Sequence, residues 1–562
     1  MIIGLDVGGT HADVVLLGKK GLIREVKVPT DPANLFDTVL TCLDEITEGI
    51  KPSDIHRIVL STTLTTNAII QRQTAPVGMI VAGGPGLDPE FFRTNKDYYP
   101  VTGSIDHRGR EIEPIDPEQI KKISCRMAKA GIRNVGVISK FSIRNPEHEI
   151  QIARLLDPSF EKIFMGHHVS GYLNFPRRIA TTYLNAAVYP IHKNFFNAVK
   201  KSLEKKGLNV PIHVLKADGG TMNFDASMDF SGQTILSGPA ASVMGSIAFA
   251  PDTEESLVLD IGGTTTDMAI LIGHVPLLNP LGINLGPYKT LIRSLETHSI
   301  GIGGDSAVAV KNGRLTIGPE RLGKPVAFDG PAPTPSDALL VLGMMKNGDR
   351  DKAAGGLEDI ARQLGLAIED TAMEIFDLAC RTILKEAGAM IENINSKPVY
   401  TIHDLLEGHT VKPKKMLVLG GPALHFAKHF EKISDYEVGV VPRWKVANAI
   451  GAALARTTCE VTLFADTQQG IAAAPEENFY DSVTRSFSKK DAIRQACSLL
   501  EKKAMQIGSH AEDLEIEVIE DMEFNMIRGF TTTGKNIRVK VQVKPGLIHG
   551  YDPVAGMLLE DM

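Results

Sequence analysis

The pattern of apolar and polar positions predicts a β-hairpin at the start of the chain, and the same pattern returns near the middle. Residues 2–17 read IIGLDVGGTHADVVLL, an apolar strand with Asp6 near its end, a Gly-Gly-Thr turn and a second apolar strand. Residues 256–271 read SLVLDIGGTTTDMAIL, with Asp260 in the place of Asp6. Short apolar runs around a glycine turn are typical of paired strands. The repeat therefore predicts two similar α/β domains.

Two further glycine turns interrupt the apolar pattern. Residues 416–419 are an apolar strand, 420–422 read Gly-Gly-Pro, and 423–430 have the pattern of a helix. A strand–Gly-Gly–helix unit lets a flat base or a ribose lie against the backbone. Residues 301–306 form another glycine-rich segment, for which a ligand-binding turn and a plain loop are equally good interpretations.

The last hundred residues have a pattern of their own. A helix is predicted over 490–506, and residues 536–543 alternate between apolar and polar side chains, as in a half-buried strand. We expect residues 459–562 to form a small α+β appendix.

Composition narrows the class of protein. The 562 residues suggest three or four domains, with 43% hydrophobic and 23% charged residues, as in ordinary globular proteins. The net charge of −7 and the lack of a basic tract disfavour nucleic acid and acidic membranes as partners. Five scattered cysteines without a CxxC pair disfavour disulfides and cysteine-bound metals. Without a signal-peptide pattern or an 18-residue apolar run, we expect a cytoplasmic protein.

The turns of the two hairpins are the main candidates for chemistry. Glycine allows close approach to phosphate oxygens, turn N–H groups and threonine hydroxyls donate to them, and paired carboxylates hold Mg²⁺ through water. The alternative is that each Gly-Gly-Thr segment is a tight turn with no ligand. The presence of two copies with matching flanking strands favours the ligand-binding interpretation. Asp6 and Asp260 are the candidate catalytic and metal-binding residues. The candidate nucleotide-binding residues are Gly8, Gly9, Thr10, Gly262, Gly263, Thr264, Thr265, Gly303, Gly304, Gly420, Gly421 and Pro422.

The hairpins and the Gly-Gly turn together resemble the actin, sugar kinase and Hsp70 nucleotide-binding superfamily. Within it, the chain resembles the hydantoinase/oxoprolinase A family from residue 1 to about 458. The segments that carry this resemblance are 62–68, 145–149, 217–220, 236–240, 260–267, 317–320 and 446–451.

The resemblance implies a fold and a function. The fold is α/β, with two duplicated actin-like (ribonuclease H-like) domains at 1–185 and 186–458 around a nucleotide cleft, followed by the appendix. The implied function is the ATP- and Mg²⁺-dependent hydrolysis of a cyclic amide, through phosphorylation of its carbonyl, with a separate B-type subunit and in an oligomer. Alternatives are another phosphotransferase, the activating subunit of a ketone carboxylase, and a non-enzymatic actin-like ATPase.

The chain departs from the family pattern at several positions. His11-Ala12-Asp13 replaces Phe-Thr-Asp, Leu60-Ser61 replaces His-Gly, and Gly303-Gly304-Asp305-Ser306 replaces Gly-Gly-Gly-Ser. We expect the added carboxylate of Asp305 to repel anions or to bind a metal. Asp13 and Asp267 are expected to accept hydrogen bonds from their own turns.

Several other residues have two interpretations. Thr65, Thr66 and Asn67 either grip a cyclic amide, as uncharged hydroxyls and an amide can, or cap a helix. His167-His168 is expected on a strand, where neighbouring side chains point to opposite faces and cannot share a metal. His148 is expected at a solvated helix start. Arg177-Arg178 either contacts substrate or caps a helix.

Overall fold

The computed structural model describes residues 1–550 apart from 9–10, 32–33, 248, 251–253, 280 and 397–409. They form two compact units. The described residues of unit 1 are 1–240, 278–294 and 452–550, and those of unit 2 are 241–277 and 295–451. The C-terminal region, expected as an appendix, thus belongs to the same unit as the N-terminus. The domain boundaries expected at 185/186 and 458/459 stay predictions.

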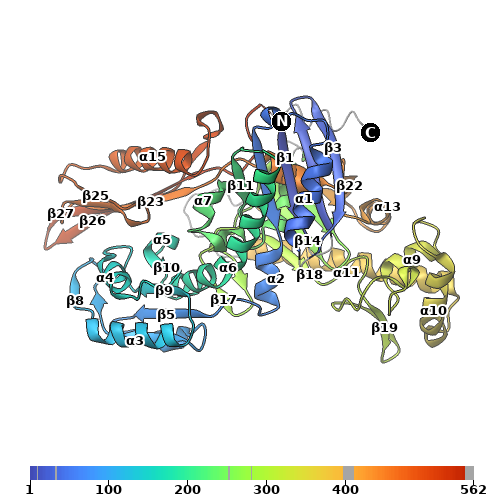
Figure 1. Ribbon diagram of the computed structural model, residues 1–562, viewed down its shortest axis with the longest axis horizontal. Helices are drawn as coiled ribbons and strands as arrows, with labels where there is room; N and C mark the ends of the chain where they lie inside the picture. The colour runs from blue at the N-terminus through green and yellow to red at the C-terminus, as the bar shows by residue number, and fades with distance from the viewer. Residues whose placement is uncertain are drawn as a thin grey trace. The chain divides into compact units, whose positions relative to one another are not determined.

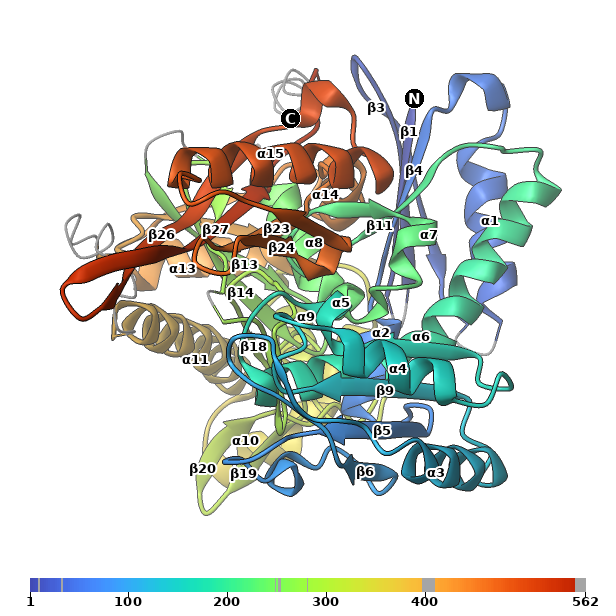
Figure 2. The ribbon, with the colours of Figure 1, turned by 90° about the vertical axis from the view of Figure 1, so that its left-hand side faces the viewer.

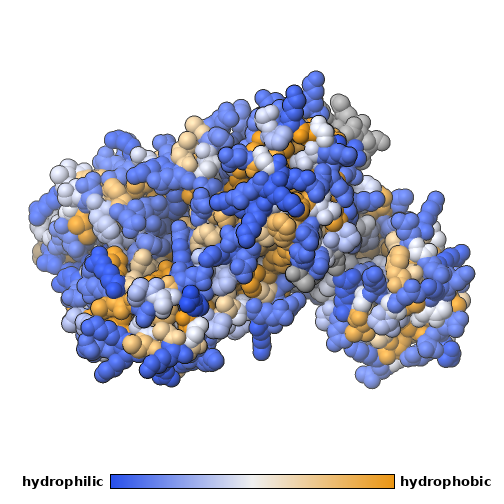
Figure 3. Space-filling view, viewed as in Figure 1, coloured by the Kyte–Doolittle hydropathy of each residue, from blue (hydrophilic) through white to orange (hydrophobic). Residues whose placement is uncertain are grey.

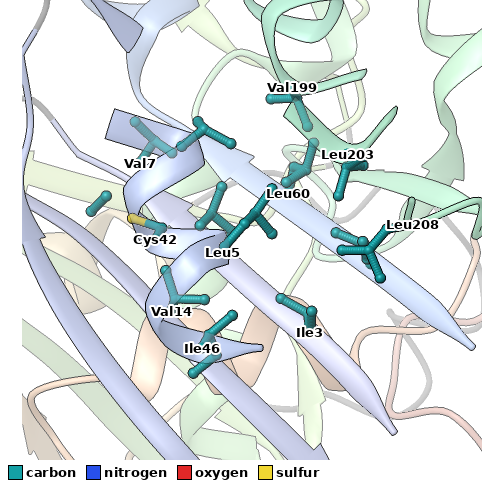
Figure 4. Close-up of a cluster of buried hydrophobic side chains, with 14 of the residues drawn as sticks. Ile3, Leu5, Val7, Val14, Cys42, Ile46, Leu60, Val199, Leu203 and Leu208 are labelled. Carbon is teal, nitrogen blue, oxygen red and sulfur yellow. The ribbon is translucent and has the colours of Figure 1, made fainter. Parts of the chain in front are cut away.

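The N-terminal sheet of unit 1 contains the first hairpin. Its strand order is β12–β11–β4–β1–β2–β3, in which β1, β4 and β11 are parallel and the hairpin β1–β2 is antiparallel. The strands are β1 (Ile2–Val7), β2 (His11–Gly18), β3 (Gly21–Pro29), β4 (Arg57–Thr62), β11 (Ile212–Leu215) and β12 (Thr221–Asn223). Apolar side chains of β1, β2 and β4 pack against α1 (Leu35–Ile46) and α6 (Phe175–Lys205), as Figure 4 shows.

A second, parallel sheet of unit 1 is covered on both faces. It has the order β10–β9–β5–β6, with β5 (Val77–Ala82), β6 (Tyr98–Val101), β9 (Asn134–Ser139) and β10 (Lys162–Met165). Helices α3 (Pro117–Lys129) and α4 (Glu147–Leu155) contribute to the core beside Ile80, and α6 contributes to the core beside Met79 (Figure 2). Coverage on both sides explains why β5 and β9 are buried at every position.

The third sheet of unit 1 confirms the elements predicted near the C-terminus. It is antiparallel, with β23 (Glu460–Asp466), β24 (Ile471–Ala474), β25 (Phe479–Ser482), β26 (Ile516–Arg528) and β27 (Thr531–Val543). Helix α15 (Lys489–Gln506) covers one face, and its outer surface is mostly hydrophilic (Figures 1 and 3). Strand β26 is one of the two edge strands, and it is exposed at most positions.

Unit 2 is built on one sheet that repeats the strand order of the N-terminal one. Its order is β15–β14–β13–β21–β22, and β18 also pairs with β14. The hairpin β13–β14 is antiparallel, and β13, β21 and β22 are parallel, as β1–β2 and β1, β4 and β11 are in unit 1. The strands are β13 (Glu255–Ile261), β14 (Thr266–Ile272), β15 (Val275–Pro276), β18 (Thr297–Ile300), β21 (Lys415–Leu419) and β22 (Glu437–Val440).

Helices complete unit 2. The long helix α11 (Ile368–Ser396) and α13 (Ala423–Ile433) pack on the sheet through Phe376, Phe426 and Phe430. The other helices are α8 (Ser237–Ile247), α9 (Pro335–Val341), α10 (Arg350–Leu364) and α14 (Ala447–Leu454), and β19 (Val308–Lys311) and β20 (Arg314–Ile317) form a hairpin. Strand β21 and helix α13 confirm the strand and helix predicted around the Gly-Gly-Pro turn.

Short elements connect the larger ones. These are α2 (Leu64–Ile70), α5 (Gly166–Val169), α7 (Phe224–Ser227), β7 (Ser104–Ile105), β8 (Glu111–Glu113), β16 (Asn284–Leu285), β17 (Tyr288–Lys289), and the 3₁₀ turns η1 (Pro52–Asp54), η2 (Pro89–Phe92), η3 (Ser231–Thr234), η4 (Val326–Phe328), η5 (Pro475–Glu477) and η6 (Ala511–Asp513). Within the described ranges, no helix is both long and apolar enough to span a bilayer.

Candidate functional site

Both hairpins place two aspartates opposite each other. Asp6 pairs with Asp13 across β1 and β2, and Asp260 pairs with Asp267 across β13 and β14. In the first hairpin the Gly8 N–H donates to the carbonyl of His11 at 3.0 Å, and Asp6 is buried. Gly9 and Thr10, two of the predicted phosphate donors, lie outside the described residues.

The carboxylate of Asp13 bonds to a lysine on the neighbouring strand, and the sequence did not predict this partner. We expected it to accept hydrogen bonds from its own turn, but it accepts from Nζ of Lys27 at 2.7 Å. Lys27 lies on β3, directly opposite Asp13 in the antiparallel pair β2–β3. The contact therefore depends on strand register, which the turn motif alone does not reveal.

Asp260 lies at the end of β13 within unit 2. Its carboxylate accepts from Oγ of Ser242 on α8 at 2.5 Å and from the side-chain amide of Asn448 on α14 at 3.4 Å. The opposite carboxyl, Asp267, has a pKa raised to about 7 by burial and by the charge of Asp260. The two facing carboxyls therefore disfavour each other's ionisation.

The glycine turns of unit 2 adjoin one another. The Gly262 N–H closes its own turn on the carbonyl of Thr265 at 2.9 Å. The Gly304 N–H donates to the Gly262 carbonyl at 2.9 Å, and the Asp305 N–H donates to the Gly263 carbonyl at 2.6 Å. Residues 303–306 are thus held against the hairpin turn, and their role in ligand binding stays a prediction.

The third turn adjoins the same hairpin. Gly420 has a φ of +94°, and a Cβ there would lie 2.6 Å from Oδ1 of Asp260. Only glycine fits so close to the end of β13. A Cβ at Gly421, by contrast, would meet no described atom within 4 Å. Gly421 therefore faces open space, and Pro422 is the N-cap of α13.

An arginine that the sequence did not reveal neutralises Asp305. Arg321 donates to Oδ2 of Asp305 at 2.9 Å and to the hydroxyl of Thr264 at 3.3 Å. Asp305 was expected to repel anions or to bind a metal, and this ion pair argues against both, because the carboxylate already has a cationic partner. The guanidinium instead lies beside Thr264, a predicted phosphate donor.

Thr65, Thr66 and Asn67 lie inside a short helix and not at its cap. Helix α2 starts at Leu64 with Thr63 as the N-cap. The hydroxyl of Thr65 is buried 3.4 Å from the carbonyl of Thr234, and Oγ1 of Thr66 accepts from the N–H of Leu236 at 2.8 Å. Both hydroxyls therefore bind the protein's own backbone, and a substrate role for the segment stays a prediction.

His148 and His167 are buried, whereas His168 is partly exposed. His148, expected at a solvated helix start, is 1% exposed, and its Nε2 lies 2.8 Å from Glu111. His167 and His168 lie on the helical turn α5 and not on a strand, and Nδ1 of His167 lies 2.5 Å from the buried carboxylate of Glu149. Among the residues that the structure describes, no cluster of His, Cys, Asp and Glu could hold a metal by itself.

The two arginines neither cap the helix nor lie free. The N-cap of α6 is Asn174. Arg178 is fully buried and donates to Oγ of Ser142 at 2.7 Å and to the carbonyl of Ser139 at 3.1 Å. Arg177 donates to two carbonyls of the segment 281–290, at 2.8 and 3.0 Å, and holds that segment on α6.

Comparison with known proteins gives a consistent picture. The family model described as hydantoinase/oxoprolinase matches residues 178–461, and the model of the corresponding N-terminal region matches residues 2–159. The caprolactamase subunit alpha of Pseudomonas jessenii is 24% identical, over 67% of this chain and 60% of its own. The acetophenone carboxylase gamma subunit of Aromatoleum aromaticum is 26% identical, over 61% of this chain and 53% of its own. The 5-oxoprolinase of Saccharomyces cerevisiae is 24% identical, over 75% of this chain and 38% of its own.

Two solved structures share the fold. A nucleotide-free acetone carboxylase superposes with a TM-score of 0.72 at 16% identity, and the ATP-dependent caprolactamase of Pseudomonas jessenii superposes with a TM-score of 0.70 at 19% identity. Each covers 98% of this chain, which in turn covers 88% of the matched chain. The chain spans little more than half the length of the two curated subunits, and less of the yeast protein.

Proposed function

Because the chain belongs to the hydantoinase/oxoprolinase family, we propose that it is the ATP-dependent component of a cyclic-amide hydrolase. Its role is to phosphorylate the carbonyl oxygen of the substrate and so to remove the amide resonance that protects the ring. The family relatives include a caprolactamase subunit and a 5-oxoprolinase, whose names state cyclic amides as substrates.

The observation that carries the proposal is the gathering of three glycine turns around Asp260. Residues 262–265, 303–306 and 420–422 come from distant parts of the sequence, yet the first two are joined by backbone hydrogen bonds and the third lies against Asp260. The N–H groups of Gly262, Gly304 and Asp305 hold the turns together, so we assign phosphate contact to the hydroxyls of Thr264 and Thr265. The matching strand order of the two hairpin sheets supports a duplicated actin-like fold, with Asp6 in the corresponding position of unit 1.

The residues of unit 2 also fit Mg²⁺. Mg²⁺ usually binds through one or two carboxylates together with water and substrate phosphates, and not in an all-protein cage. Asp260, opposite Asp267 in the hairpin, provides such a carboxylate. When bound, the ion would neutralise negative charge on the phosphates.

This chain's own residues position the phosphoryl group. The substrate carbonyl oxygen forms a bond to the γ-phosphorus while the bond to the bridging oxygen breaks, and ADP leaves. Thr264 and Thr265 donate to phosphate oxygens, and Arg321, paired with Asp305, donates to the Thr264 hydroxyl and holds it in place. Water then adds to the activated carbon, the ring C–N bond breaks, and a second water releases phosphate from the acyl phosphate. We assign these hydrolytic steps to a separate B-type subunit, since named relatives are subunits.

The test is ATP hydrolysis with hydantoins, lactams and oxoproline, measured with and without a B-type partner. Asp260→Asn should lower Mg²⁺-dependent turnover by orders of magnitude while the melting temperature is kept. The matched control is Asp370→Asn, since Asp370 is an exposed carboxylate on α11 of the same unit. Unchanged turnover in the Asp260 variant would exclude the metal-organising role of this residue.

A second candidate is the activating subunit of a ketone carboxylase. The observation that favours it is the fold similarity to acetone carboxylase over 98% of the chain. Both reactions start from a phosphorylated carbonyl, so the ATP site is the same in the two proposals. Ketones in the substrate panel, with bicarbonate present, distinguish them.

A further inference from the structure

Unit 1 contains a recess that the proposed function does not use. It lies between the turn that joins β7 to β8, the segment that follows β9, the segment before α6, and the antiparallel C-terminal sheet. All its lining residues belong to unit 1. Its volume is about 270 Å³, room for roughly twenty water molecules at about 10–15 Å³ each, and therefore for a small organic molecule.

The recess lies outside the carboxyl ends of the parallel sheet β10–β9–β5–β6. Its lining residues His107 and Arg108 follow β6 in the chain, Phe141 and Arg144 follow β9, and Leu173 follows β10. The chain passes from β5 to β6 on one side of β5 and then returns to β9 on the other side, which makes β5 and β9 a topological switch point. Open α/β sheets bind ligands at this end of their strands, beside such a point.

The C-terminal sheet supplies the apolar side of the recess. Phe464 on β23, Ile471 at the start of β24 and Met526 on β26 line it. The Arg144 guanidinium lies over the Phe464 ring, with its carbon 3.1 Å from the ring centroid. Leu173 and Ile471 are 37% and 38% exposed, so large apolar side chains remain in contact with water around a charged centre. An apolar body bound here would remove that surface from water.

The backbone brings Arg108 and Arg144 together. The side-chain amide of Asn145 donates to the carbonyl of Gly109 at 2.9 Å, which fastens the β7–β8 turn to the segment after β9. A Cβ at Gly109 would lie 3.4 Å from Cβ of Arg144, and Gly109 has a φ of +83°, which glycine adopts without strain. Arg108, the neighbour of Gly109 in this turn, is exposed and lines the same recess.

Arg144 has no anionic partner among the described residues. Its Nε and Nη1 are buried without a hydrogen-bond partner, and Nη2, which donates to no described atom either, is not buried and is the open donor group. Oδ1 of Asp466, the acid whose charge acts on Arg144, accepts from two backbone N–H groups of its own turn at 2.9 and 3.0 Å. Burial, chiefly, and the charge of Arg538 lower the pKa of Arg144 to about 10, so the guanidinium is still charged at neutral pH. The lining holds two arginines and one aspartate, a formal charge of +1.

We propose that this recess binds a small organic anion, with its carboxylate between Arg108 and Arg144 and its apolar body against the C-terminal sheet. Hydrogen bonds between a guanidinium and a carboxylate are strong, because both groups are charged. Arginine also keeps its charge when it is partly buried, which suits the position of Arg144. The inference stands on unit 1 alone and does not depend on the ATP-dependent activity.

The experiment is calorimetric titration of the full chain, without ATP, with benzoate, benzamide and inorganic phosphate. Benzamide has the shape of benzoate without its charge, and phosphate has the charge without an apolar body. We expect benzoate to bind and the other two to bind at least about tenfold more weakly. No benzoate binding up to about 10 mM, or binding of benzamide or phosphate as tight as that of benzoate, would overturn the proposal.

Variants test the two arginines. Arg144→Gln and Arg108→Gln each remove one positive charge from the recess, and each should weaken benzoate binding at least about fivefold. Arg108 is exposed, so its variant keeps the fold and decides the case in which Arg144→Gln does not fold. Arg154→Gln is the matched control, because Arg154 is exposed on α4 and does not line the recess. Wild-type benzoate affinity in Arg108→Gln or in folded Arg144→Gln, or an equal loss in Arg154→Gln, would overturn the proposal.

Discussion

Substitution of Gly421 by valine should weaken ATP binding at the proposed site without lowering the stability of the fold. A Cβ at this position would meet no described protein atom within 4 Å outside its chain neighbours, so the fold should lose no more than about 0.5 kcal/mol of stability. If adenosine rests on this turn, the same side chain takes the volume of the base or ribose. We expect the dissociation constant of Mg·ATP to rise at least about tenfold, or about 1.4 kcal/mol.

The neighbouring glycine provides the contrast. Gly420 has a φ of +94°, and its Cβ would collide with the carbonyl of Ile261 and lie 2.6 Å from Asp260. Gly420→Ala should therefore destabilise the fold by about 2 kcal/mol or more, since the left-handed backbone alone costs about 1–2 kcal/mol. Thermal unfolding measures this loss independently of any ligand.

Calorimetry with two ligands completes the test. Pyrophosphate lacks the base, so its affinity should be the same in wild type and Gly421→Val. If ATP affinity stays unchanged in this variant, or if ATP and pyrophosphate weaken equally, the turn is not the base site. The hairpin evidence around Asp260 would be unaffected by that result.

Three further outcomes follow from the contacts. Arg321→Ala leaves the charge of Asp305 uncompensated beside the phosphate turn, so the Kd of Mg·ATP should rise about tenfold. The double variant Arg321→Ala/Asp305→Ala should restore the wild-type Kd. Calorimetric titration of both variants with Mg·ATP tests this. Arg178→Met removes the hydrogen-bond donor of buried acceptors and the positive charge near the Glu149 carboxylate. The free energy of unfolding, measured with denaturant, should fall by about 3–5 kcal/mol. A fall of less than about 1 kcal/mol would contradict the buried network. Glu476 has a folded pKa of about 8 against an ordinary 4.5, so its contribution to stability is present below about pH 4.5 and is lost as the pH rises through 8. Glu476→Gln should therefore gain melting temperature over wild type between about pH 5 and pH 8.5, and parallel profiles would refute the shift.

Local sequence patterns predicted the elements of the fold well, because the information lay in short windows. The hairpin over 256–271, the strand and helix around Gly420 and the helix over 490–506 each appear where apolar periodicity and glycine placed them. In these segments the residues that decide the structure are neighbours in the chain.

Contacts between distant segments were not predictable in this way. Arg321 reaches Asp305 and Thr264 only because the loop before it folds back on the hairpin. His148 looked solvated between two glutamates, but packing of α4 buries it beside Glu111.

The long edge strand β26 has a consequence for handling the protein. Its free edge offers unpaired backbone groups, and Phe524, Ile527 and Phe530 are more than 60% exposed along the hairpin. Such an edge invites pairing with another chain, and charged side chains normally discourage it. Here that protection comes from the acidic side chains at 517, 520, 521 and 523. Replacing these acidic residues by their amides should therefore promote aggregation through this hairpin first.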